Sequence, residues 1–528
     1  MPNHAHRSLS LLIALHFGLA STAIAQAPAQ AKPEFAAETP IYRVMPSVGF
    51  PYGRDGVHGA RLSKQEFEQR RQAFWEELKR HGPGTIAIAK SAPVMPRNGD
   101  EDYEYRQDSD FYWLTGLHEP DAIAIFEVEA LPEGAASQPN GSVASSSGED
   151  NASKPVGVPR YTLVVRPRDP NAESWTGKRV GPEGAIRDFG ADAAMPARRG
   201  KAQREMIESL VQRAKTLVVI NNNDKDFGKV IDSALDKAKE RSDGPRRVDG
   251  RAWIHSRRLI KTKEEIEMMR KACEVSIEGH LAAMRATRPG MNEGEIEAAA
   301  EFVFRALGGP RLGYATIAGA GNNGCVLHYQ TNDHRLGEND LMLMDASAEV
   351  GMYTADITRT WPVNGKFTPE QRAIYEIVLA AQDAGIAAAQ VGRGFHEVHQ
   401  AAARTVSDGL VKLGILQVKP DEVFESGRSH TFFPHGTSHW LGMDVHDVGG
   451  YGPGGAVLAP GMILTVEPGI YIPKGMKGVD EKWWGIGVRI EDDILVTESG
   501  PVNLTARLPR DPEVIEAIVR EGQAALKK

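Results

Sequence analysis

Five residues in the second half of the chain have the types and contexts of metal ligands: Asp345, Asp356, His439, Glu467 and Glu491. Asp345 follows the apolar run 341–344, and the others stand in strand-like or turn-like surroundings where a solvated charge is not expected. A buried carboxylate is costly unless it is paired or binds a metal. Four carboxylates and one imidazole form an oxygen-rich set, which suits two divalent ions better than one structural zinc. The set therefore predicts a site for two metal ions, which can share a bridging carboxylate and a bridging water.

Spacing along the chain indicates how two of these residues would meet. Asp356 lies 11 residues after Asp345, and a hairpin that turns near 349–351 would place their strands side by side. Taken singly, either aspartate fits a turn or a strand-end ion pair equally well. Residues 492 and 493 are also aspartates, so the choice of Glu491 as the ligand in that run stays open on residue types alone.

Several stretches of the chain resemble the Xaa-Pro aminopeptidases (aminopeptidase P), within the pita-bread metallopeptidases that include prolidase and methionine aminopeptidase. The resemblance covers roughly Ser63 to the C-terminus and is carried by six stretches: Tyr105–Phe111, Gly324–Tyr329, Asp356–Gly365, His435–Gly449, Thr465–Gly469 and Gly485–Asp493. The ordered set Asp, Asp, His, Glu, Glu in these contexts is highly specific. It implies a dinuclear metallo-aminopeptidase that hydrolyses the bond before proline with a metal-bridging hydroxide.

The resemblance implies a role for each ligand candidate. Asp345 should chelate one ion, Asp356 and Glu491 should bridge both, and His439 and Glu467 should complete the other site. Glu467 is also expected to be the general base, because it would touch both the ion and the nucleophile. The expected cofactors are two divalent ions per active site, with Mn²⁺ as the first choice and Co²⁺ or Zn²⁺ as alternatives.

Five further residues are implied in catalysis or substrate binding. His328, His435 and His446 would line the substrate groove, polarise the scissile carbonyl and assist the leaving proline nitrogen, although a single histidine is more often a satisfied core residue. Arg489 lies two residues before Glu491 and would share its face on a strand, where it could orient that carboxylate. Trp175 matches an aromatic residue that a neighbouring subunit contributes to the proline slot in this family.

The elements that must position these residues fall into two domains. Alternating strand and helix patterns over 63–247 predict a small α/β domain, with a helix at 63–80 and strands at 85–89, 123–128, 161–165 and 217–220. A catalytic domain at 251–528 is expected to mix helices with a mainly antiparallel sheet, the pita-bread fold. A capping box at Thr262 and a cap at Thr368 followed by Pro369 mark two of its helices. Its strand-like runs lie at 341–346, 352–362, 463–466 and 487–496.

Three other segments are expected to lie outside these domains. Residues 1–25 have a weakly basic start, a short apolar run and Ala23-Ile24-Ala25 before Gln26, the pattern of a cleaved secretory signal peptide. The mature protein is therefore predicted to be exported, to the periplasm or beyond, and soluble. Residues 26–62 read as an extended arm. Residues 131–159 are rich in Ser and Gly and predict a flexible insertion.

Composition limits the partners. Charged residues make up 25% and hydrophobic residues 41% of the chain, as in globular proteins, and the net charge of −8 argues against nucleic acid. The only two cysteines, Cys273 and Cys325, give no disulfide framework. The expected partners are peptides that begin with Xaa-Pro, and the resemblance implies a homo-oligomer, a dimer or tetramer.

Two other functions compete with the aminopeptidase. A prolidase, which cleaves only Xaa-Pro dipeptides, has the same metal set. A binding protein on the same fold would have lost the metal ions, and the complete set of five ligand candidates speaks against that class. A nucleotide site in the glycine-rich run 319–324 is disfavoured, because no phosphate-binding Lys-Ser/Thr follows it.

Overall fold

The computed structural model of the chain describes residues 51–52, 56–129, 160–220, 224–240, 244–451 and 456–526. All of them belong to one compact unit, Val44–Lys528. The expected signal peptide, most of the expected arm and the expected insertion at 131–159 lie outside the described residues. None of the described helices is both long and apolar enough to cross a membrane.

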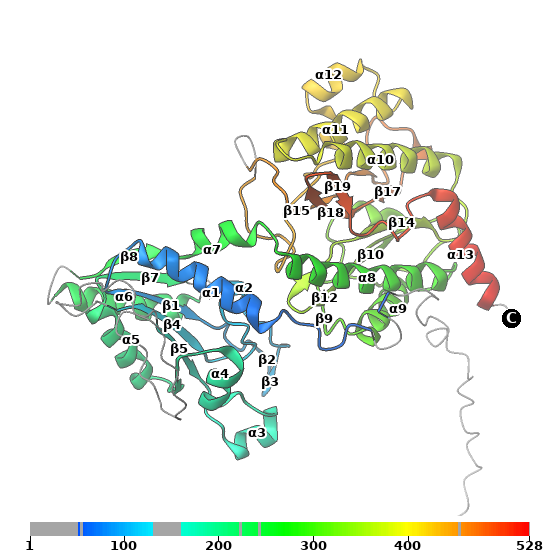
Figure 1. Ribbon diagram of the computed structural model, residues 1–528. Helices are drawn as coiled ribbons and strands as arrows, with labels where there is room; N and C mark the ends of the chain where they lie inside the picture. Colours follow the sequence, from blue (N-terminus) through cyan, green and yellow to red (C-terminus); the bar gives the residue numbers. More distant parts are fainter. Residues whose placement is uncertain are drawn as a thin grey trace, which may run out of the picture. The chain divides into compact units, whose positions relative to one another are not determined.

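The N-terminal domain is built on a six-stranded sheet in the order β6-β5-β4-β1-β7-β8 (Figure 1). The β1–β4 and β4–β5 pairs are antiparallel and the other three pairs are parallel. The strands are β1 (Thr85–Lys90), β4 (Ile123–Val128), β5 (Arg160–Val165), β6 (Ala193–Pro196), β7 (Thr216–Ile220) and β8 (Arg246–Asp249), beside a small hairpin of β2 (Pro96–Asn98) and β3 (Glu101–Asp102). The helices are α1 (Lys64–Lys79), α2 (Ser109–Thr115), α3 (Pro170–Thr176), α4 (Gly181–Phe189), α5 (Lys201–Arg213) and α6 (Lys225–Lys239).

Both faces of this sheet are covered, which explains why its strands are continuously apolar. Successive residues of a strand point to opposite faces, so Ala87 and Ala89 of β1 belong to the core that contains α1. Ile86 and Ile88 of the same strand pack with residues of α5 and α6 instead. The strands that the sequence predicts in this domain are therefore confirmed as a three-layer α/β core.

The catalytic domain contains four small antiparallel sheets between helices (Figure 1). The three-stranded sheets have the orders β10-β11-β14, β13-β12-β9 and β15-β18-β19, and β16 pairs with β17. The strands are β9 (Arg311–Leu312), β10 (Ile317–Ala320), β11 (Leu341–Asp345), β12 (Ala348–Val350), β13 (Tyr353–Thr354), β14 (Thr358–Pro362), β15 (Ile463–Val466), β16 (Gly469–Ile472), β17 (Ile486–Arg489), β18 (Asp492–Thr497) and β19 (Gly500–Asn503).

Helices of the catalytic domain pack in pairs, α8 with α9 and α10 with α11, and Figure 1 shows the strands lying between these pairs. The expected capping boxes are present: Thr262 caps α8 and Thr368 caps α10, which has a proline in its first turn. The helices are α7 (Arg251–Arg258), α8 (Lys263–Ala286), α9 (Glu293–Ala306), α10 (Pro369–Ala388), α11 (Phe395–Lys412), α12 (Pro420–Glu425) and α13 (Pro512–Leu526), with short 3₁₀ turns η2 (Gly321–Cys325), η3 (Arg428–Thr431) and η4 (Glu481–Trp483).

Two of the expected strands differ from the structure in the same way. The run 352–362 is interrupted between β13 and β14, and the run 487–496 is interrupted between β17 and β18. The two breaks contain Asp356 and Glu491, respectively. Each acidic side chain therefore lies at a joint between sheets rather than within a regular strand.

The hairpin expected near 349–351 is present as β12 and β13, joined by a two-residue loop. Gly351 and Met352 both have positive φ, 58° and 74°, as a two-residue hairpin turn with the twist of its strands requires. Cys273 and Cys325 are free; Cys273 is buried in α8, and Cys325 packs beside a small apolar cluster.

Candidate metal centre

Two of the ligand candidates are brought together by the pairing of β11 with β14. Asp345 ends β11 and lies opposite Thr358, the first residue of β14. Asp356 stands two residues before Thr358 and is 4% exposed. The backbone at the end of one strand and the start of the next thus directs both carboxylates into the same cavity, of about 610 Å³.

The segment 437–439 runs beside β15, and this pairing places His439 next to Glu467. The backbone N–H of Thr465 donates to the carbonyl of His439 at 3.0 Å, and the backbone N–H of Glu467 donates to the carbonyl of Thr437 at 2.8 Å. His439 Nε2 lies 3.6 Å from Glu467 Oε1 and 3.2 Å from Asp356 Oδ2. One imidazole therefore faces two carboxylates from segments that are far apart in the sequence.

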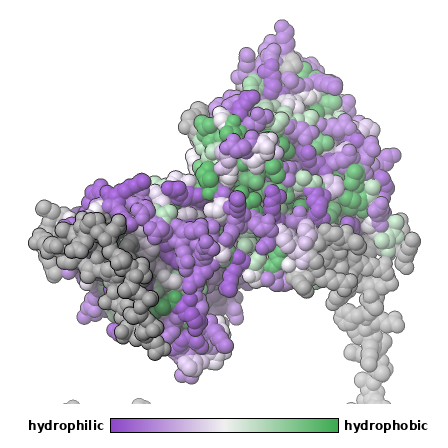
Figure 2. All heavy atoms as spheres, in the orientation of Figure 1, coloured by the Kyte–Doolittle hydropathy of each residue, from purple (hydrophilic) through white to green (hydrophobic). Residues whose placement is uncertain are grey.

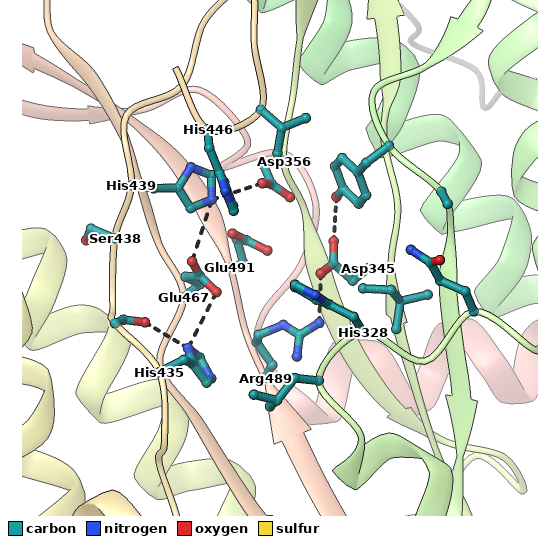
Figure 3. A pocket seen from close by; sticks show the side chains of 17 residues that line it. His328, Asp345, Asp356, His435, Ser438, His439, His446, Glu467, Arg489 and Glu491 are labelled. Carbon is teal, nitrogen blue, oxygen red and sulfur yellow. Dashed lines mark hydrogen bonds and ion pairs between the residues drawn. The ribbon is translucent and has the colours of Figure 1, made fainter. Parts of the chain in front are cut away.

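Glu491 completes the cluster from the break between β17 and β18. Its backbone N–H donates to the carbonyl of Thr358 at 3.1 Å, and the Thr358 hydroxyl donates to Glu491 Oε2 at 2.7 Å. Ligand atoms of Asp356, His439 and Glu491 all lie within 4.8 Å of one another. Figure 3 shows these three side chains facing a common centre, with Glu467 below them and Asp345 to one side.

Charge in this cluster is poorly balanced by protein groups. Burial raises the pKa of Glu467 to about 7, with the neighbouring carboxylates adding to the shift, and it raises the pKa of Asp356 and Glu491 for the same reasons. Burial alone would lower the pKa of His439, but the hydrogen bond to Asp356 and the charge of Glu467 raise it to about 9. Arg489 is the only arginine or lysine among the described residues that line the cavity.

The donor set fits divalent cations. Three buried carboxylates and the half-buried Glu467 face one guanidinium and one imidazole, so the cluster carries an excess of negative charge that a low-dielectric site cannot tolerate unpaired. Two divalent ions would supply the missing charge, and oxygen ligands suit hard cations such as Mn²⁺.

Arg489 is fixed by three partners. Its Nη2 donates to Asp345 Oδ2 at 2.7 Å, its Nη1 to the Tyr471 hydroxyl at 3.0 Å, and its Nε to the Thr358 hydroxyl at 3.1 Å. The sequence argument pairs Arg489 with Glu491, whereas the structure pairs it directly with Asp345 and reaches Glu491 only through Thr358. The reason is that β17 ends at Arg489, so the two residues do not share one strand face.

The three histidines of the expected groove all line the cavity. His435 lies between the Tyr471 hydroxyl, 2.7 Å from Nε2, and the carbonyl of Gly436, 2.8 Å from Nδ1. Burial and the charge of Arg489 lower the pKa of His435 to about 3, so this ring is neutral. The ring of His446 lies 4.3 Å from that of His439, and burial followed by the charge of His439 lowers its pKa.

Trp175 is not brought to this cavity by its own chain. It lies on α3 of the N-terminal domain and is 88% exposed. A role at the proline slot would therefore require a second subunit, as the resemblance implies, and stays a prediction.

Sequence reasoning missed three residues that hold the site. Tyr314 donates a hydrogen bond to Asp345 Oδ1, Thr358 binds Glu491, and Glu293 of α9 anchors the loop that carries His328. Thr358 could have been found from its place two residues after Asp356. Nothing in the pattern around Tyr314 or Glu293 indicates a partner far along the chain.

Glu293→Gln is expected to destabilise the protein by about 1–3 kcal/mol, because the buried carboxylate accepts hydrogen bonds that an amide cannot all accept. Its two oxygens receive the backbone N–H of Ala320 (2.7 Å) and of His334 (2.8 Å), the Tyr329 hydroxyl (3.0 Å) and the Asn323 amide (3.1 Å). Urea unfolding would measure the loss, with Glu376→Gln, an exposed residue, as the control. An unchanged free energy of unfolding would contradict this assignment.

Comparisons with known proteins agree with the geometry. The model of metallopeptidase family M24 matches residues 267–498, and that of the aminopeptidase P N-terminal domain matches residues 67–219. The chain is 39% identical over 470 residues to the Xaa-Pro aminopeptidase of Escherichia coli (strain K12), covering 87% of this chain and 98% of that protein. It is 31% identical over 474 residues to Xaa-Pro aminopeptidase 3 of Homo sapiens, covering 87% of each. Its fold is similar to that of Pseudomonas aeruginosa aminopeptidase PepP, with a TM-score of 0.78 at 38% identity, over 88% of this chain and 99% of that one.

Proposed function

Because the chain belongs to the Xaa-Pro aminopeptidases of metallopeptidase family M24, we propose that it releases the N-terminal residue from peptides whose second residue is proline. The observation that carries the proposal is the convergence of the five ligand candidates in one cavity, in a chain that aligns with these enzymes over 87% of its length. The competing idea of a metal-free binding protein would leave three buried carboxylates and the half-buried Glu467 with Arg489 as the single arginine or lysine among the described lining residues.

Divalent ions are proposed to be held by the five-residue set, with Mn²⁺ as the first choice. Asp345 would serve one ion, Asp356 and Glu491 both, and His439 and Glu467 the other. When bound, the ions lower the pKa of water and polarise the scissile carbonyl. The short contacts among Asp356, His439 and Glu491 support shared ligation.

Glu467 is proposed as the general base. Its Oε1 lies 3.6 Å from His439 Nε2 and its Oε2 lies 3.7 Å from His435 Nδ1, and all three residues line the cavity. A buried carboxylate whose pKa is raised towards neutrality can accept a proton from the attacking water and pass it to the leaving nitrogen. Arg489 would keep Asp345 in place through its 2.7 Å contact.

The histidines are proposed to orient the peptide. His435 is neutral and held by Tyr471, so it offers the substrate an uncharged ring with a fixed orientation. His328 and His446 would contact the carbonyls on either side of the scissile bond. Trp175 of a neighbouring subunit would pack on the proline ring, in a dimer or tetramer.

The cavity favours an aminopeptidase over a prolidase. A prolidase must bind the carboxylate that directly follows proline, and a cation is the usual partner for a carboxylate. Arg489 alone among the described lining residues is an arginine or lysine, and it is already bound to Asp345 and Tyr471. His435 and His446 have lowered pKa values and are neutral near pH 7.

A comparison of two substrates tests this choice. The enzyme is expected to cleave an Xaa-Pro-Xaa tripeptide with a kcat/KM at least as high as that for the Xaa-Pro dipeptide, because the exit end of the cavity offers a dipeptide's carboxylate no free cation. An Xaa-Ala-Xaa tripeptide is the control for proline preference. Good turnover of the dipeptide with no cleavage of the tripeptide would identify a prolidase instead.

A further inference from the structure

One motif of the N-terminal domain has no part in the site described above. The stretch Tyr105–Phe111 leads into α2, and none of its residues lines the metal cavity. It reaches the catalytic domain instead. Arg106 Nη2 donates to the carbonyl of Met443 at 2.5 Å, and the Ser109 hydroxyl donates to Asp444 Oδ1 at 2.6 Å. The motif therefore contacts the loop that carries His446.

Arg258, at the end of α7, joins this motif to the same loop. Its Nη1 donates to Asp110 Oδ1 of α2 at 2.7 Å. Its Nη2 donates to both Asp444 Oδ2 (2.7 Å) and Asp447 Oδ1 (2.6 Å). The Arg258 side chain is only 3% exposed, so these charge-assisted bonds lie in a low-dielectric environment where they are strong. One guanidinium group thus holds both ends of the four-residue segment 444–447, whose third residue is His446.

The loop is packed tightly over this cluster. Lys261 Nζ binds the second oxygen of Asp447 at 3.0 Å, and the backbone N–H of Asp447 donates to the carbonyl of Trp440 at 2.8 Å. A β-carbon on Gly442 would lie 2.1 Å from Asp447 Oδ2, so the backbone at Gly442 passes directly against this carboxylate and has no space for a side chain.

His446 itself has no side-chain hydrogen bond to any described residue. Its ring lies against that of His439, and Figure 3 shows the two side by side at the cavity. Its position must therefore come from the backbone on either side, where Asp444 and Asp447 are bound to Arg258.

We propose that Arg258, bound to Asp110 of the N-terminal domain, is a positioning residue that fixes His446 at the metal cavity. The inference rests on the proposed function, because it assigns a cause to the placement of one of its substrate-orienting residues. It makes the N-terminal domain a part of its own chain's active site, through the motif 105–111.

Metal binding should not depend on the contacts that Arg258 makes. His439 is held by β15, since its backbone N–H donates to the Thr465 hydroxyl at 3.1 Å and its carbonyl accepts from Thr465 N–H. A change at Arg258 should therefore move His446 and leave the ligand set loaded, which separates positioning from general damage.

Arg258→Lys tests the proposal, because lysine keeps the charge but cannot hold three carboxylates in a fixed geometry. The expected result for an Xaa-Pro-Xaa peptide is a fall in kcat of about tenfold to a hundredfold, as a misplacement near 1 Å can cause, with metal content unchanged. Arg70→Lys is the matched control. Arg70 is also 3% exposed and also joins the two domains, through Glu265, yet it binds nothing in the loop 441–447. It should lose stability but keep kcat.

A double-mutant cycle with His446→Ala decides whether Arg258 acts through His446. Arg258→Lys is expected to lower kcat when it is made in the wild-type protein, but to lower kcat little further when it is made in the His446→Ala variant. An equal loss in both backgrounds, or an unchanged kcat in Arg258→Lys, would overturn the proposal. If Arg258→Lys does not fold, Ser109→Ala is tested in the same cycle with the same criteria; it removes the hydrogen bond from Ser109 to Asp444 and the one that Ser109 accepts from Arg106. Lack of turnover by the wild type would instead refute the proposed function.

Discussion

Removing the divalent ions is expected to abolish peptide cleavage and to leave a protein to whose stability Glu467 and His439 contribute less as the pH rises from about 4.5 to about 9. The first effect follows because the ions supply the chemistry that the residues of the cavity lack. The second follows from the buried ligand set, whose members hold protons more tightly in the folded protein than in the unfolded chain.

The sign of the pH effect can be worked out from two residues. Glu467 has a pKa raised from 4.5 to about 7, so the folded state binds an extra proton between these values and stability is lost as the pH rises through about 7. His439 has a pKa raised from 6.5 to about 9, so its contribution is present below 6.5 and is lost as the pH rises through about 9. The contributions of both residues to stability therefore fall as the pH rises.

Bound ions should reverse this trend, because they compete with the same protons for the same atoms. Above pH 6.5, where the lowered pKa of His435 no longer changes the balance, the Tm of chelator-treated protein should fall as the pH rises to 9, and the rise in Tm on adding Mn²⁺ should grow over that range. Glu467→Gln is the matched variant: relative to the parent it should remove the decline that Glu467 contributes between about pH 4.5 and 7, and it should lower the pH at which the part due to His439 is lost, because the charge of Glu467 helps to raise the pKa of His439. Full activity after chelation, or an ion-free Tm that rises between pH 6.5 and pH 9, would contradict the assignment of the site.

The helices of the chain were the most predictable part of the fold. Thr262 and Thr368 each carry an acidic or amide partner three residues later, and both capping boxes are present in the structure. Such signals are local, since the cap and the residue that it serves lie within one turn. The apolar strands 85–89 and 217–220 were predictable for a similar reason, because both faces of their sheet are covered.

The strand breaks at Asp356 and Glu491 were not predictable from the pattern. Each break is set by contacts with residues far along the chain, such as the bond from Asp356 N–H to Asp493 Oδ2, 137 residues away. The pairing of Arg489 with Asp345 is equally non-local, at 144 residues. The types of the ligand candidates could therefore be chosen from the sequence, but not the way in which separate sheets meet around them.

The same difference between local patterns and long-range contacts explains why the sequence marked the motif 105–111 but did not indicate what it does. Its residue types resemble a family pattern, while its partners Met443 and Asp444 lie more than three hundred residues away. A resemblance shows that a segment matters to a family, and only the contacts show what it holds.

Asp356→Asn is expected to lower kcat/KM by more than about a thousandfold, which corresponds to about 4 kcal/mol of transition-state stabilisation. The substitution keeps the size of the side chain but removes its charge and one of its two acceptor oxygens. Asp356 lies 3.2 Å from His439 Nε2, closer than Glu467 at 3.6 Å, and shares its cluster with Glu491, so an amide there would leave both neighbours without their common partner.

Stability should respond to Asp356→Asn in the opposite direction from activity. Burial and the charge of Asp345 raise the pKa of Asp356, which shows that its ionised form is disfavoured in the ion-free protein. Replacing it by a neutral amide should leave the ion-free Tm unchanged or higher, while the Mn²⁺-induced rise in Tm is lost. Asp383→Asn, at an exposed carboxylate of the same domain, should alter neither quantity. A variant that binds its full complement of metal and keeps more than about a tenth of the activity, little more than 1 kcal/mol of change, would show that Asp356 is not a shared ligand.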